Sequence, residues 1–127
     1  MALPAPAHHT LSLATYRKNG AAIRTPVWFI VKDEKIWVGT PDSSLKVKRL
    51  RNNPKVQYAL CNSSGKKILG EWSDGTARLV KDPATLDWLV ASEKAKYRFQ
   101  YWFIVQVLYP LMGKKGPWTA IEITPDS

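Results

Sequence analysis

Residues 21–40 read AAIRTPVWFIVKDEKIWVGT, and this stretch carries the strongest indication of the fold. Two runs of β-branched and aromatic residues flank the polar segment KDEK, which predicts two antiparallel strands joined by a turn. Pro26 cannot donate a hydrogen bond to a neighbouring strand, so it marks a sheet edge or a bulge. Trp28 follows closely, and a broken ladder beside a large aromatic side chain is suited to a planar ligand. The alternative is that Trp28, like the tryptophans of the other predicted strands, fills the core.

The rest of the chain extends this pattern to about six strands and a few helices. Asn19-Gly20 favours a tight hairpin turn, and Asp82 followed by Pro83 favours a helix start. The pattern predicts a small antiparallel barrel with helices packed against it, mainly β with α, in one domain of residues 1–127. Residues 1–9 are expected to be a mobile tail. The further strands are expected at 13–20, 55–61, 70–80 and 116–124, and the helices within 42–54, 82–97 and 97–112.

The apolar segment 97–112 has two interpretations. It can form a helix that covers one mouth of the barrel, which is the structural interpretation and the one we favour. It can also form an exposed patch that joins subunits or touches a membrane surface, because so apolar a run is rarely left uncovered. It falls short of the roughly 20 apolar residues that a membrane-spanning helix needs. No membrane span is therefore expected.

The charge of the chain points to an anionic partner. Its 127 residues carry a formal net charge of +9 and an isoelectric point near 9.8. Nucleic acid, an anionic membrane surface and a phosphorylated small molecule are all compatible with that charge. Cys61 is the single cysteine, which excludes an intrachain disulfide and favours the cytoplasm. The first ten residues also lack the basic start and apolar core of a signal peptide.

The segment PDSSLKVKRLRNNP, residues 41–54, discriminates among these partners. At steps of about 100° per residue, Val47 and Leu50 form a narrow buried face, while the cations spread over the remaining sides. A helix barely two turns long with scattered charge is poorly suited to reading a nucleic-acid groove. Its serine-rich start instead offers hydroxyls and free N–H groups to one anion, within reach of Lys46. The cations are Lys46, Lys48, Arg49 and Arg51, followed by Lys55.

The usual catalytic motifs are missing from the sequence. The adjacent His8 and His9 have no cysteine or third histidine at ligand spacing, so no metal site is expected. No nucleophile elbow, phosphate-binding glycine loop or zinc-protease motif occurs. If the protein is an enzyme, its reactive atoms are expected to belong to a cofactor.

The order of these segments resembles the flavin-binding split-barrel superfamily, which contains pyridoxamine-phosphate oxidases and deazaflavin (coenzyme F-420) dependent reductases. The resemblance begins near Thr10 and covers nearly all of the remaining chain. The amino-acid sequence of these segments is most similar to the small deazaflavin branch. The segments that carry the resemblance are IRTPVWF, IWVGT, SSLKVKRLRNNP, KVQYALC, GEWSDGTARLV, KYRFQYWF and AIEIT.

The resemblance implies a homodimer of six-stranded antiparallel split β-barrels, with the cofactor in a groove at the subunit interface. By position, Arg24, Thr25, Pro26 and Val27 would line the edge of the isoalloxazine ring, and Trp28 would pack close to the ring or substrate. Anion-binding positions match Thr40, Ser44 and Lys46, with Lys48 as an additional cation. The oxidase branch usually carries Arg before the matching Lys, whereas this chain has Leu45, which argues against vitamin B6 oxidation.

The resemblance therefore implies an oxidoreductase that moves a hydride between a reduced cofactor and an unsaturated or quinone-like small molecule. The cofactor would be coenzyme F-420 or FMN. A long anionic deazaflavin tail would also use Arg49, Arg51 and Lys55, although each of these can equally be a solvated surface charge. The alternative is a carrier of flavin, haem or another tetrapyrrole on the same fold, without turnover. Nucleic-acid binding is supported by charge alone, and we do not expect it.

Overall fold

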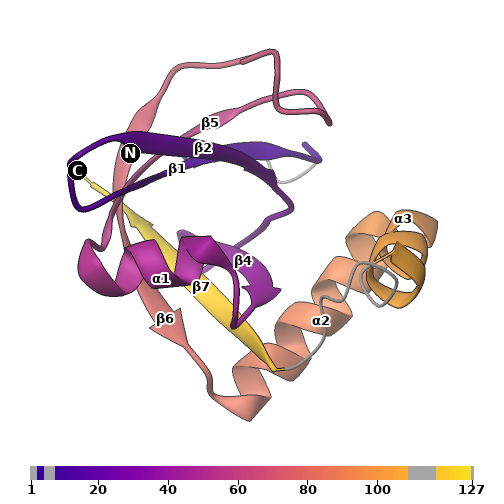
Figure 1. Cartoon of the computed structure of the whole chain (residues 1–127). Helices are drawn as coiled ribbons and strands as arrows, with labels where there is room; N and C mark the ends of the chain where they lie inside the picture. Colours follow the sequence, from indigo (N-terminus) through magenta and orange to yellow (C-terminus); the bar gives the residue numbers. More distant parts are fainter. Residues whose placement is uncertain (1–2, 5–7, 109–116, 127) are drawn as a thin grey trace.

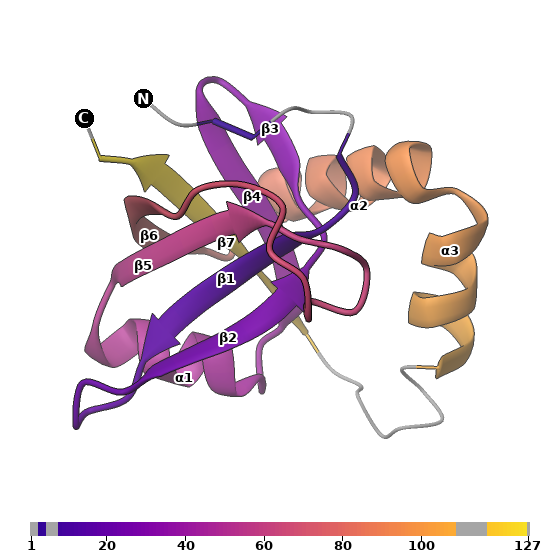
Figure 2. The same ribbon diagram turned by 90° about the horizontal axis from the view of Figure 1, so that it is seen from above.

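One antiparallel sheet of seven strands forms the body of the protein. The computed structural model describes residues 3–4, 8–108 and 117–126. Figures 1 and 2 show the sheet curled on itself into an open barrel. Its strands follow the order β2-β1-β5-β6-β7-β4-β3, in which every neighbouring pair is antiparallel. Their bounds are β1 Leu11–Tyr16, β2 Ala22–Val27, β3 Ile30–Lys32, β4 Lys35–Pro41, β5 Lys55–Leu60, β6 Ser73–Val80 and β7 Trp118–Pro125.

The strand predicted over 21–31 is two strands, which raises the expected count from about six to seven. β2 ends at Val27 and β3 begins at Ile30, and the two lie at opposite edges of the sheet. A link of only two residues, Trp28 and Phe29, therefore joins the two edges. Such a link holds the edges close together, so the sheet has to curl. Pro26 lies on the edge strand β2, as its missing N–H predicts.

At this break the N–H and the carbonyl of Phe29 form hydrogen bonds with side chains of a helix instead of with a neighbouring strand. Its N–H donates to the Tyr97 hydroxyl at 3.0 Å, and its carbonyl accepts from Lys96 Nζ at 2.9 Å. The Tyr97 hydroxyl in turn donates to the His9 carbonyl at 2.6 Å. The Phe29 side chain is fully buried. An unpaired buried backbone group would be costly, so these contacts stabilise the interruption.

The two tight turns have the geometry that their residues predict. Gly20, with φ of +89°, closes the hairpin between β1 and β2, where its N–H donates to the Arg17 carbonyl at 2.9 Å. Asp33 and Glu34, with φ of +55° and +60°, join β3 to β4. Two successive residues with positive φ match the twist of antiparallel strands. Both predicted hairpins are confirmed.

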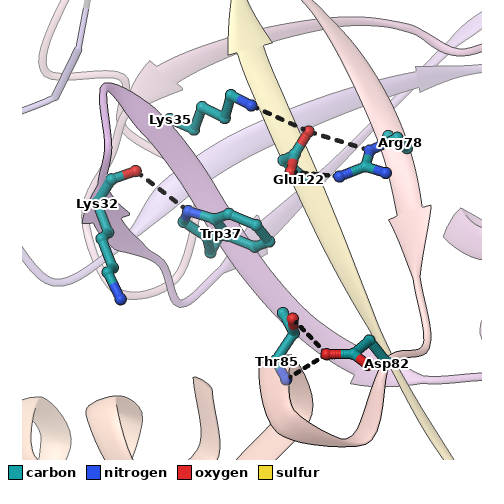
Figure 3. Close-up of polar contacts among 7 residues, drawn as sticks. All are labelled: Lys32, Lys35, Trp37, Arg78, Asp82, Thr85 and Glu122. Atoms are coloured by element: carbon teal, nitrogen blue, oxygen red, sulfur yellow. Dashed lines mark hydrogen bonds and ion pairs between the residues drawn. The ribbon is translucent and has the colours of Figure 1, made fainter. Parts of the chain in front are cut away.

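Two helices lie within the predicted ranges 42–54 and 82–97. Helix α1 (Leu45–Asn52) starts after Ser44, whose hydroxyl accepts from the Val47 N–H, and it buries Val47 and Leu50 as expected. Helix α2 (Pro83–Tyr97) starts after Asp82, whose carboxylate accepts from the N–H and the hydroxyl of Thr85, both at 3.0 Å (Figure 3). A charged cap of this kind stabilises the first turn.

Helix α2 packs across the sheet beside β3, β4 and β7. Near its start the Trp88 ring meets the Trp37 ring edge-to-face at 5.4 Å. The Trp37 indole N–H donates to the Lys32 carbonyl, which ties β4 to the end of β3 (Figure 3). Because these contacts lie along one flank, α2 covers the β3 edge of the sheet.

The apolar segment after α2 is helical where the structure describes it. Helix α3 (Phe99–Tyr101) continues as the π-helix η1 (Trp102–Leu108), and Figure 2 shows α3 standing away from the strands. Phe99, Trp102 and Phe103 are exposed by 70%, 53% and 42%. Residues 109–112 of the predicted helix lie outside the described residues, as does much of the predicted tail. In the described part of the chain, no helix has the length and apolarity to cross a membrane.

Replacing Tyr97 by Phe tests the contact with Phe29. We expect the free energy of unfolding to fall by about 1–3 kcal/mol, because the Phe29 N–H and the His9 carbonyl lose their partner in a buried place. Urea unfolding followed by fluorescence measures the change. The control is Tyr16→Phe, because within the described residues the Tyr16 hydroxyl has no hydrogen bond. Equal stabilities of the two variants would contradict the role assigned to Tyr97.

Candidate functional site

Two hollows adjoin each other on the barrel, and one of them lies where the sheet is interrupted. The first, here called the aromatic hollow, has a volume of about 230 Å³. The second, called the basic hollow, has a volume of about 490 Å³. The aromatic hollow is lined by Thr10, Pro26, Val27, Trp28, Gly39, Thr40, Lys46, Ser63, Glu93, Ile104, Val105 and Trp118. The basic hollow is lined by Arg17, Ile23, Thr25, Thr40, Pro41, Ser43, Ser44, Leu45, Lys46 and Arg49.

Thr40 and Lys46 line both hollows, so the two share a wall. Thr40 lies near the end of β4, and Lys46 lies in the first turn of α1. The loop between them is short because Ser44 caps the helix directly. A single elongated molecule can therefore contact both hollows.

The aromatic hollow is built at the break after β2. Trp28 stacks on the Tyr97 ring, with centroids 4.2 Å apart and planes 8° from parallel. Tyr97 is held by its contacts with Phe29 and His9, so the Trp28 ring has a fixed support. Burial raises the pKa of the Tyr97 hydroxyl well above its ordinary value, and this hydroxyl stays protonated.

The basic hollow gathers three cations, Arg17, Lys46 and Arg49. Arg49 donates from Nε to the Thr15 hydroxyl at 2.6 Å, and Arg17 lines the same hollow. Burial, together with the charge of Arg17, lowers the pKa of Arg49 below its ordinary value. Among the described residues neither arginine forms an ion pair. A bound anion would relieve this repulsion.

Thr25 adds a polar atom without a partner to the same hollow. Its hydroxyl oxygen is buried and makes no hydrogen bond to any described residue. Most buried hydroxyls in proteins are hydrogen-bonded, so an unpaired one needs an explanation. A ligand atom in the basic hollow would supply the missing partner.

Most residues implied by the resemblance come together here. Pro26, Val27 and Trp28 line the aromatic hollow, Thr25 and Ser44 line the basic hollow, and Thr40 and Lys46 line both. Two others lie elsewhere. Arg24 packs its guanidinium over the Trp72 ring at 4.7 Å, and Lys48 is exposed on α1; neither lines either hollow.

The outer cations of α1 also separate. Arg51 pairs with Asp42 at 3.4 Å, and Lys55 lies at a different cavity beside Asp74. Arg49, one of the cations that helical spacing put outside the buried face, reaches across to β1 and the basic hollow. Its long side chain makes this contact with β1, which spacing along a helix cannot predict. Arg17 was not among the predicted site residues, because the sequence around it indicates an ordinary hairpin turn.

Glu93 is the main residue that the sequence analysis missed. It lies in the buried stripe of α2 between Leu89 and Tyr97, four residues from each, and it is only 5% exposed. The Gly39 N–H donates to its Oε1 at 3.3 Å. A side chain at position 39 would bring Cβ within 3.1 Å of this oxygen, so glycine permits the close approach. The sequence did contain a signal for Glu93: an acidic residue stands at a position where helical spacing predicts a buried apolar one.

The charge state of Glu93 is unusual. Burial raises its pKa from 4.5 to about 7, although the Gly39 N–H and the Lys96 charge act in the opposite direction. Burial also lowers the pKa of Lys96 to about 8, and its ammonium points to the Phe29 carbonyl and ring. In the described residues Glu93 has no ion pair within 4.0 Å.

Glu122, which is also 5% exposed, shows the opposite behaviour. Arg78 and Lys35 pair with its carboxylate at 2.9 Å and 3.5 Å, across β6, β7 and β4 (Figure 3). The hydrogen bond from Arg78 is the largest cause of the lowered pKa of Glu122. The two carboxylates are equally little exposed, but they differ in surroundings: paired cations favour the ionised form of Glu122, whereas deeper burial disfavours the ionised form of Glu93.

Comparisons with known proteins agree with this architecture. Curled antiparallel strands with short helices and a site at the interruption define a split barrel. Residues 4–127 match the family described as pyridoxamine 5'-phosphate oxidase. The chain belongs to this family, within the split-barrel superfamily that the sequence resembled.

Solved structures with this fold have diverse descriptions. Rv2991, a conserved hypothetical protein of Mycobacterium tuberculosis, is 24% identical with a TM-score of 0.69, covering 94% of this chain and 74% of its own. HutZ, a haem storage protein of Vibrio cholerae, is 16% identical (TM-score 0.66; 94% and 83%). An F420 reductase is 17% identical (TM-score 0.62; 94% and 87%). At these identities the likeness shows the fold alone. No match was found among curated proteins.

Glu93→Gln is expected to change how stability depends on pH. In the folded protein Glu93 ionises near pH 7, against 4.5 in an unfolded chain, so the unfolded state loses its proton first. The wild-type protein should therefore lose stability, relative to Glu93→Gln, as the pH rises from 5 to about 7.5. The difference should grow by roughly 2–3 kcal/mol.

Urea unfolding at several pH values measures this difference. The same series on Glu122→Gln should show no such growth, because paired cations favour the ionised form of Glu122 in the folded state. A constant difference between wild type and Glu93→Gln over this range would mean that Glu93 ionises normally.

Proposed function

We propose that the protein binds a phosphorylated flavin-type cofactor across the two hollows and uses it as an oxidoreductase. The observation that carries the proposal is the shared wall of Thr40 and Lys46, which joins an aromatic hollow to a basic one. A molecule with a planar ring at one end and an anion at the other matches that arrangement. The membership of the oxidase family supports the same conclusion.

The residues of the basic hollow fit the anionic end. Arg17, Lys46 and Arg49 supply positive charge, and Ser44 supplies a hydroxyl at the start of α1. Charge-assisted hydrogen bonds from guanidinium and ammonium groups to phosphate are strong. The unpaired Thr25 hydroxyl adds a donor. These groups would fix the cofactor by its anionic end and so position its ring.

The residues of the aromatic hollow fit a ring. Pro26 and Val27 give an apolar edge, and Trp28 gives a plane held by Tyr97. A bound flavin or deazaflavin supplies hydride-transfer chemistry, which this chain's own side chains do not offer. The protein's part would be to orient the ring, exclude water and admit an unsaturated or quinone-like small molecule beside it.

Coenzyme F-420 and FMN are the two cofactors we consider. FMN ends in one phosphate, whereas the deazaflavin carries a phosphodiester and a polyglutamate tail. A hollow of about 490 Å³ with three cations has room and charge for more than one anionic group, which favours coenzyme F-420. The fold shared with an F420 reductase is in keeping with this choice.

Non-catalytic carriage of a flavin or a haem is the second candidate function. The observation that favours it is the shared fold with a haem storage protein. Turnover separates the two, because a carrier would bind its ligand without reducing any acceptor in a panel of quinones and unsaturated compounds.

A cytoplasmic location is part of the proposal, supported by the single buried Cys61.

The proposal includes a homodimer with the site near the subunit interface. Leu45, at the rim of the basic hollow, is 68% exposed, and Phe99 and Trp102 are exposed on α3 and η1. A second copy could cover such side chains. Sedimentation should then give twice the chain mass of 14.4 kDa, and a monomer at all concentrations would contradict the dimer.

Titration of the purified protein with FMN and with coenzyme F-420 tests the cofactor site. We expect saturable binding, with at least a tenfold loss of affinity in Lys46→Ala, because a charge-assisted contact to phosphate contributes about 1.5–3 kcal/mol. Lys48→Ala should change the affinity less than about threefold, because Lys48 lies outside both hollows. Fluorescence of the cofactor and of the tryptophans reports binding.

Equal losses in the two lysine variants would mean that the anion site is misplaced. Failure of the wild-type protein to bind either cofactor would refute the cofactor proposal. Steep, salt-dependent binding to DNA in place of cofactor binding would favour the nucleic-acid alternative.

A further inference from the structure

Glu93 is a buried acid in the wall of the aromatic hollow, and the proposed cofactor binding gives it no role. It shares that wall with Trp28, Thr40 and Lys46. Only the Gly39 N–H holds its carboxyl by a hydrogen bond, through Oε1 at 3.3 Å. Within the described part of the chain, no second hydrogen bond to the Glu93 carboxyl is found. The carboxyl therefore has bonding capacity left for a molecule in the hollow.

The groups around Glu93 explain why it is not neutralised by a cation. Lys96, one turn further along α2, directs its ammonium to the Phe29 carbonyl at 2.9 Å and to the Phe29 ring. Tyr97 and Tyr101 are phenols whose own pKa values are raised by burial, with a further contribution from Glu93. From α1, Lys46 lines the same hollow, while β4 contributes the uncharged Gly39 and Thr40.

A protonated carboxyl and an ionised one would treat a bound molecule differently. The protonated form donates one hydrogen bond, whereas the ionised form only accepts and repels anions. Glu122 shows that the fold ionises a buried carboxylate where it supplies cations. At Glu93 it supplies none within 4.0 Å among the described residues, and the site favours the donor form.

We infer that Glu93 contacts the ligand in the aromatic hollow and donates a hydrogen bond from its protonated carboxyl to a carbonyl or ring-nitrogen acceptor of that ligand. This inference rests on the proposed function, since it takes the occupant to be a heteroaromatic ring. It also makes binding depend on the proton. The complex holds the proton, so ionisation of the free protein weakens binding as the pH rises.

The experiment is the titration of FMN and of coenzyme F-420 against pH in three proteins: wild type, Glu93→Gln and Glu122→Gln. Between pH 6 and pH 8 the wild-type dissociation constant should rise about tenfold more than that of Glu93→Gln. The glutamine amide donates at every pH, so this variant should bind within about threefold of wild type at pH 6. Glu122 is as little exposed as Glu93 but lies outside both hollows, so Glu122→Gln should follow the wild-type profile.

Calorimetry in buffers of different ionisation enthalpy gives a second measurement if Glu93→Gln does not fold. At pH 8 the FMN phosphate, with a pKa of about 6, is already ionised. Wild type and Glu122→Gln should each take up nearly one proton per FMN bound. Parallel pH profiles in all three proteins, or binding without proton uptake, would overturn the role of Glu93 while leaving the cofactor site intact. Absence of binding to either cofactor would refute the proposed function itself, and the role of Glu93 with it.

Discussion

The fold depends on how the backbone of Phe29 is held outside the sheet. β2 and β3 lie at opposite edges, and only Trp28 and Phe29 connect them. The N–H and carbonyl of Phe29 find partners on α2, in Tyr97 and Lys96. Without those partners the interruption would leave buried polar groups unpaired. The same contacts fix Tyr97, which supports Trp28 and so shapes the aromatic hollow.

Local features of the fold could be predicted from the sequence because short-range chemistry decides them. Asn19-Gly20 and KDEK form the expected turns, Ser44 and Asp82 cap the expected helices, and Pro26 lies on an edge strand. The division of residues 21–31 into two strands could not be predicted in this way. Both halves have strand composition, and only partners on α2, distant in sequence, make the break between them stable.

The residues of the candidate site also differ in whether the sequence could predict them. Residues on contiguous segments, such as Pro26–Trp28 and Ser44–Lys46, could be placed by their order along the chain, and they line the hollows. Arg17 and Glu93 could not, because one stands in a hairpin turn and the other on a late helix. For Arg49 the sequence left open a tail-binding cation or a solvated charge, because a flexible side chain of its length can leave the direction that helical spacing assigns to it. Tertiary approach, not local pattern, brings these three to the site.

The wall that Thr40 and Lys46 share between the two hollows limits how the protein can diverge. A substitution there that widens the room for one half of a ligand also moves or recharges the surface facing the other half. Selectivity for a head group and selectivity for a tail are therefore not independent traits in this chain. Changes of preference should arise first at positions that face one hollow alone, such as Ser63 or Ile23, where each half can vary without penalty to the other.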